Sequence, residues 1–136
     1  MSNATVFDPL LVHYLARELD ERLRGRGCAA APHFASGRVA ILPLQGREAL
    51  QLDLHPTRGW VRLVPWDEES DELESACVAV SAPPDERRIE VALHAADRFR
   101  VEPRRLIVEL HSNQWNALLV SGSDERILAA ALAVPV

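Results

Sequence analysis

Apolar residues recur every fourth position near the start of the chain, at Leu11, Leu15, Leu19 and Leu23, with Leu10 and Tyr14 beside them. This spacing is typical of an amphipathic helix, so we predict a helix over residues 8–23 with the four leucines buried. Asp8 can accept hydrogen bonds from the first free amides, and Pro9 suits the first helical position. Gly25 can end the helix, because glycine tolerates the backbone conformation that follows a last turn.

Beyond Gly27 the period changes to the alternation that is typical of half-buried strands. We predict strands over residues 38–44, 50–55, 60–64, 89–94, 106–110 and 117–120, with hairpin turns at 56–59 and 111–114. Pro43 marks the end of its strand or a sheet edge. Residues 127–134 form a last apolar segment that fits either a helix or a strand. One helix followed by many short strands predicts an α+β fold dominated by antiparallel sheet.

Length, charge and cysteine content narrow the classes of protein that fit. The chain has 136 residues, enough for one domain with a real core, and a net charge of −5 counts against RNA as its sole partner. Cys28 and Cys77 are too few for a disulfide scaffold, so we predict two reduced, buried thiols. We expect a cytoplasmic protein, because neither a signal peptide nor an apolar run of membrane-spanning length is present.

No motif of catalysis or of cofactor binding is present. The five histidines do not form a metal-binding pair, and no P-loop, nucleophile elbow or dinucleotide fingerprint occurs. Residues 67–74 carry six carboxylates in eight positions, which fits a short acidic helix, a solvated loop or a metal site. The segment lacks the glycine that a calcium loop requires. We therefore expect neither an enzyme nor a bound cofactor or small-molecule substrate.

Arginine and tryptophan are the remaining candidates for function. The chain has no lysine, so all 15 of its basic residues are arginines, and Arg87, Arg88, Arg104 and Arg105 form two adjacent pairs. Guanidinium groups bind phosphate in a bidentate manner, so these residues could form a phosphate-facing edge. The alternative is a coding bias for arginine, with exposed strands paired to nearby carboxylates. Trp60 and Trp115 begin predicted strands, where a large ring usually closes a core.

The order of several segments resembles the N-terminal domain of the fibronectin-binding protein A family, also called the NFACT N-terminal domain. The segments are residues 7–23, His55-Pro56 with 61–63, 73–78, 88–90, and 106–110 with Asn116. The resemblance implies a helix packed on an antiparallel β-sandwich or open barrel, as in the N-terminal domain of formamidopyrimidine-DNA glycosylases. It also implies that residues 127–134 form a strand.

For function, the resemblance implies a non-enzymatic module of ribosome quality control that binds tRNA and the large ribosomal subunit. The aspartate and arginine that the family uses fall on Asp8 and Arg88, and we expect Arg87, Arg88, Arg104 and Arg105 to contact phosphates. We also expect residues 1–136 to be one domain of a longer protein, since family members continue into further domains.

Two departures from the family keep an alternative open. Arg87 stands where the family has an aspartate, and the acidic segment 67–74 replaces a basic helix. Carboxylates repel phosphate, so the alternative is a protein-interaction or adhesion domain that has lost RNA binding.

Overall fold

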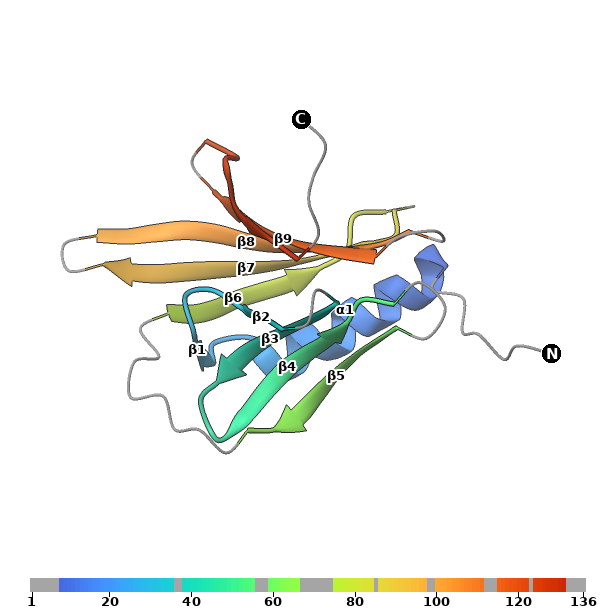
Figure 1. Cartoon of the computed structure of the whole chain (residues 1–136), viewed down its shortest axis with the longest axis horizontal. Coiled ribbons are helices and arrows are strands. Elements are labelled where there is room, and N and C mark those ends of the chain that lie inside the picture. Colours follow the sequence, from blue (N-terminus) through green and yellow to red (C-terminus); the bar gives the residue numbers. More distant parts are fainter. Residues whose placement is uncertain are drawn as a thin grey trace.

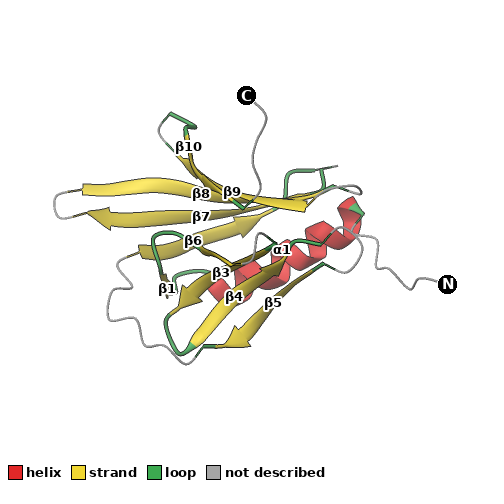
Figure 2. Cartoon of the chain, viewed as in Figure 1, coloured by secondary structure: helices red, strands yellow, loops and turns green. Residues whose placement is uncertain are grey.

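The computed structural model describes residues 8–35, 38–55, 59–66, 75–84, 86–97, 100–111, 115–122 and 124–131. Within these residues, one helix packs on a single antiparallel sheet of ten strands (Figures 1 and 2). The elements are α1 (Pro9–Leu23), β1 (Gly27–Cys28), β2 (His33–Ala35), β3 (Val39–Leu44), β4 (Glu48–Asp53), β5 (Trp60–Pro65), β6 (Ser75–Ser81), β7 (Arg88–Asp97), β8 (Arg100–Leu110), β9 (Trp115–Ser121) and β10 (Ile127–Ala130). The predicted α+β fold is confirmed, and the sheet does not close into a barrel.

The sheet consists of two meanders joined by one short strand. Its order is β10-β9-β8-β7-β6-β1-β3-β4-β5, with β2 paired to β3 outside this path. Strands β6 to β10 form one meander and β3 to β5 the other, and β1 pairs with β6 on one side and β3 on the other. Figure 1 shows the two meanders diverging from this junction, with α1 packed along β6 and β7.

Helix α1 begins and ends as the sequence predicts. An oxygen of the Asp8 carboxylate accepts from the amide of Leu11 at 2.8 Å, and Pro9 follows as the first helical residue. Gly25 adopts a φ of +81°, a conformation that other residues rarely take. Asp8 and Pro9 thus define the start of α1, and Gly25 ends the helix shortly before β1.

The predicted apolar stripe of α1 is wrong at its first two positions. The buried positions are Val12, Ala16, Leu19 and Leu23, whereas Leu15 is half-buried and Leu11 is 37% exposed. A strict four-residue spacing advances about 40° per step around a helix of 3.6 residues per turn. Leu11 therefore lies on a flank of the helix, while Val12 occupies the core face.

All six predicted strands are present. Pro43 is the last but one residue of β3, in agreement with the predicted strand end, and its carbonyl accepts from the amide of Ala29 at 3.0 Å. Trp60 is 49% exposed, whereas Trp115 is buried as predicted. Because side chains alternate along a strand, burial of Val61 in the core places Trp60 on the opposite face. Residues 127–130 form β10, as the resemblance implied.

Both cysteines lie in the core as free thiols, as predicted. Burial raises the pKa of Cys28 to about 12, and the neighbouring Cys77 contributes to the increase. Burial likewise raises the pKa of Cys77 to about 11, with a further contribution from Asp20. Both side chains therefore stay protonated and act as small hydrophobic groups.

Asp20 joins α1 to β6, and its charge should make the stability of the domain depend on pH. Its carboxylate accepts from the amide of Val80 at 2.8 Å and pairs with Arg24 at 2.9 Å. These contacts, the Val80 amide first, hold the pKa of Asp20 below its ordinary value. A lowered carboxyl pKa stabilises the fold above about pH 4, and that contribution disappears as the pH falls further.

We therefore expect Asp20→Asn to lower the free energy of unfolding at neutral pH, with the deficit shrinking toward pH 3. Urea unfolding of both proteins across this range measures the difference, and Glu21→Gln on the exposed helix face serves as the control. A deficit that stays constant with pH would show that the charge of Asp20 contributes nothing.

Candidate functional site

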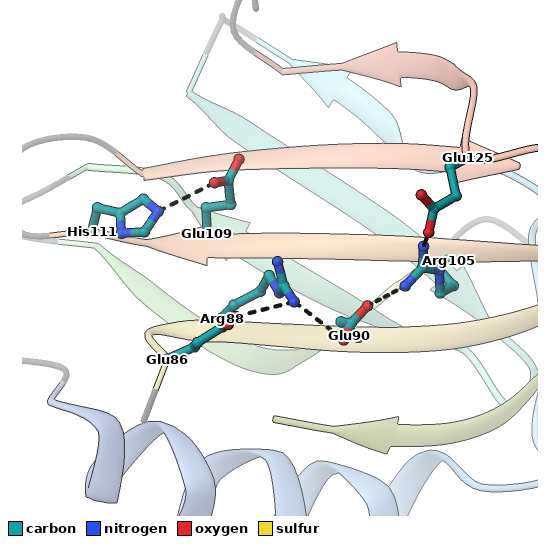
Figure 3. Close-up of polar contacts among 7 residues, drawn as sticks. All are labelled: Glu86, Arg88, Glu90, Arg105, Glu109, His111 and Glu125. Atoms are coloured by element: carbon teal, nitrogen blue, oxygen red, sulfur yellow. Dashed lines mark hydrogen bonds and ion pairs between the residues drawn. The ribbon is translucent and has the colours of Figure 1, made fainter. Parts of the chain in front are cut away.

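The described residues carry a row of charged side chains on the outer face of β7 and β8, the face opposite the core. Along β7, Ile89 and Val91 are buried, so the alternating positions Arg88 and Glu90 point outward. The same alternation along β8 buries Leu106 and Val108, and turns Arg105 outward. Strand pairing thus brings charges that are distant in the sequence onto one surface (Figure 3).

These charges form a chain of ion pairs, which we call the Arg–Glu network. Arg88 pairs with Glu86 at 3.0 Å and with Glu90 at 3.9 Å. Arg105 pairs with the other oxygen of Glu90 at 2.6 Å and with Glu125 at 3.0 Å. Figure 3 shows Glu90 lying between the two guanidinium groups. Only 16% of the Glu90 side chain is exposed, so its ion pairs are less screened by solvent than those of the more exposed Glu86 and Glu125.

The surface of the network has more negative than positive charge. Three carboxylates surround two guanidinium groups, and Glu109 lies nearby with His111 at 3.2 Å. A phosphate that approached Arg88 or Arg105 would have to displace a carboxylate that is already bound. The geometry therefore suits an uncharged or basic partner group better than a phosphate.

The structure does not bring the four predicted arginines onto one surface. Arg104 points to the face opposite that of Arg105, where it donates to the carbonyl of Ala30 at 3.1 Å and pairs with Glu102 at 3.5 Å. Arg87 precedes β7, and its carbonyl accepts from the amide of Leu110 at 2.8 Å. Adjacent residues of a strand point to opposite faces, so Arg104 and Arg105 of β8 do not share one surface.

Asp8 and Arg88, the two residues implied by the resemblance, lie toward the same end of the domain. Figure 1 shows that α1 and β7 both start at this end. Asp8 caps α1 through the amide of Leu11, whereas Arg88 belongs to the Arg–Glu network.

A groove between α1 and β5 is a feature that the sequence did not reveal. Its volume is about 200 Å³, and it is lined by Leu15, Glu18, Leu19 and Arg22 of α1 and by Val61, Arg62 and Leu63 of β5. The sequence feature that could have revealed the groove is a second face of the helix, because Leu11, Leu15, Glu18 and Arg22 recur at helical spacing. This face borders the core stripe and turns toward β5.

The acidic segment 67–74 lies outside the described residues. Within the part of the chain that the structure describes, no three histidine, cysteine or carboxylate side chains are grouped so that they could hold a metal ion. The same part contains no helix with the length and apolar character needed to cross a membrane.

Comparison with known proteins gives matches in structure but not in sequence. No protein-family model and no curated protein matches the sequence. The fold resembles the N-terminal domain of the fibronectin-binding protein PavA from Streptococcus pneumoniae, with a TM-score of 0.75 and 19% identity. It also resembles the N-terminal part of the fibronectin/fibrinogen-binding protein from Streptococcus suis (TM-score 0.76, 19% identity) and the fibrinogen-binding protein from Staphylococcus aureus (0.73, 17%).

The matches extend over nearly all of this chain. They cover 96% of it, but only 55%, 55% and 52% of the three solved chains, so it spans about half of their length. At this level of identity the likeness establishes the fold alone. The chain thus has the fold of the N-terminal domains of streptococcal fibronectin-binding proteins, as the resemblance implied.

Proposed function

We propose that this domain is a non-enzymatic, protein-binding module. The observation that carries the proposal is the Arg–Glu network, in which Arg88 and Arg105 are already held by glutamates. Surfaces that bind nucleic acid usually present guanidinium groups to solvent with a local excess of positive charge. Here the excess is negative, which favours a protein partner.

Fibronectin and fibrinogen are the first partners to test, because the structural neighbours are named for binding them. We expect the immobilised chain to bind at least one of these proteins in biolayer interferometry at physiological salt. Binding to tRNA should be weak under the same conditions. Absence of binding to both proteins, together with tight tRNA binding that falls steeply with salt, would contradict the proposal.

A second candidate function is association with tRNA and the large ribosomal subunit. The placement of Asp8 and Arg88 toward one end of the domain favours it, because the family resemblance assigns its function to these two positions. Arg87 adds to this candidate, since no ion pair joins it to another described residue. Binding to purified large subunits that falls after Arg87→Ala plus Arg88→Ala would support this candidate.

Glu90→Gln provides a direct test of the charge argument. The substitution keeps the shape of the side chain but removes the carboxylate that holds both Arg88 and Arg105. We expect tRNA affinity to rise at low salt, because each of the two guanidinium groups then keeps one glutamate partner in place of two. The free energy of unfolding should fall by about 1.5–3 kcal/mol, the usual contribution of hydrogen bonds to charged groups.

The matched control is Glu102→Gln, which removes a carboxylate on the opposite face of β8. Gel-shift titrations of both variants with tRNA compare the two faces. Equal affinity of the wild type and Glu90→Gln at low salt would show that the Arg–Glu network does not control access to phosphate.

A further inference from the structure

Strand β5 ends the sheet, and among the described residues only β4 pairs with it. The amide of Trp66 donates to the carbonyl of Arg47 at 2.9 Å, which fixes the alternation of hydrogen bonds along this pair. Because alternate residues of an antiparallel strand bond to the same neighbour, the amides of Arg62 and Val64 point toward β4. Those of Val61 and Leu63 therefore point outward, and none of the described residues accepts from them.

The outward amides of Val61 and Leu63 form a short template for one more strand. Their carbonyls point the same way, while Pro65 has no amide hydrogen and ends the template. The opposite edge of the sheet, β10, is a poorer template because a bulge interrupts it between Ile127 and Ala129. Edge strands with unpaired amides are common sites for extended peptides, which bind by adding to the sheet.

The flank of α1 that faces β5 would lie beneath an added strand. This flank carries Leu11, which is 37% exposed, and the half-buried Leu15 one turn later. Leu15 lines the groove opposite Val61 and Leu63. Alternate side chains of a strand on β5 would point into this groove, so apolar residues at those positions would cover both leucines.

Arg62 indicates the charge of the partner. It alternates with Val61 and Leu63 along β5, so its side chain lies on the face of the strand away from the groove, beside the side chains of an added strand that do not enter the groove. Arg62 lies 3.9 Å from the carboxylate of Asp53, at the outer limit of an ion pair, and 53% of its side chain is exposed. We propose that the outer edge of β5 and the flank of α1 bind an extended segment of a partner protein in which apolar and acidic residues alternate. This inference rests on the proposed function, because it specifies where and how the protein partner binds.

A designed peptide of about six residues, alternating valine and glutamate, is the probe for this site. In the free domain, NMR should show rapid hydrogen exchange at the amides of Val61 and Leu63 and slow exchange at Arg62 and Val64. Addition of the peptide should slow exchange at Val61 and Leu63, and a peptide of alternating valine and lysine should act more weakly. Slow exchange at Val61 and Leu63 before any peptide is added would overturn the inference.

Leu11→Glu tests the helix flank without threatening the fold. Leu11 is the third helical residue, where glutamate is favoured by the helix dipole and by capping. We expect this variant to bind the valine–glutamate peptide roughly tenfold more weakly, because an acidic group replaces the apolar contact and repels the peptide. Leu10→Glu makes the same change at the neighbouring position, on the side of α1 away from the core, and should bind normally.

Leu63→Pro tests the strand edge, since it removes one outward amide and leaves every amide that bonds to β4. We expect a roughly tenfold loss of peptide affinity, and Leu11→Glu still decides the question if this variant unfolds.

The outcomes separate this inference from the proposed function. Peptide binding at β5 without binding of fibronectin or fibrinogen would keep the inference as a site and overturn those two partners. Binding of fibronectin or fibrinogen that is unchanged in Leu11→Glu and Leu63→Pro would keep the proposed function and overturn the β5 site.

Discussion

Leu23→Ala should lower the free energy of unfolding by about 2–5 kcal/mol, the usual cost of removing a buried leucine side chain. Leu23 is fully buried at the end of α1, where the helix turns into the sheet. The helix is capped at both ends, so it cannot easily shift to fill the cavity that the missing side chain would leave. Urea unfolding followed by circular dichroism measures the loss.

Leu11→Ala is the matched control, because it makes the same change on the same helix at a position that is 37% exposed. We expect a cost of about 1 kcal/mol or less, since little apolar surface returns to water and alanine favours the helix. A larger loss for Leu11→Ala than for Leu23→Ala would mean that Leu11 faces the core and Leu23 does not.

The second large effect is expected at Gly59, immediately before β5. A β-carbon at this position would collide with the ring of Trp115 and with the backbone carbonyl of His55. This carbonyl is part of the backbone and cannot rotate away as a side chain could. Gly59→Ala must therefore displace β5 or the buried ring of Trp115. We expect a loss of about 3 kcal/mol, at the upper end of the cost of overpacking a core.

Thermal unfolding, with tryptophan fluorescence as a second readout, would detect both the loss and the displaced ring. Gly27→Ala is the control, because its added carbon would meet only the flexible side chain of Gln45, at 3.3 Å. Equal melting temperatures for wild type and Gly59→Ala would show that this contact does not constrain the fold.

Local signals in the sequence were sufficient for most elements of the fold. Asp8 and Pro9 specify the start of α1 through capping, and alternating apolar residues specify the strands. Strands β1 and β2 were missed because elements of two and three residues are too short to show a period. The exposure of Leu11 was missed because it depends on which side of α1 the sheet covers.

The candidate site was less accessible to sequence reasoning, because strand register assembles it. Glu90 and Arg105 meet across the pairing of β7 with β8, and Glu125 joins them from the turn before β10. The sequence showed two arginine pairs, but alternation along β8 separates Arg104 from Arg105. The outward amides of β5 follow from a pairing that no single segment encodes.

The joining role of β1 has a consequence for how this chain folds. Each meander pairs strands that follow one another in the sequence, so each requires only short loops to close. The pairing of Cys28 with Ser75 instead joins segments on opposite sides of the whole β3–β5 meander. Closing so long a loop costs more conformational entropy before any contact compensates for it. We therefore expect the two meanders to form early and the domain to become one cooperative unit only when β1 and β6 meet.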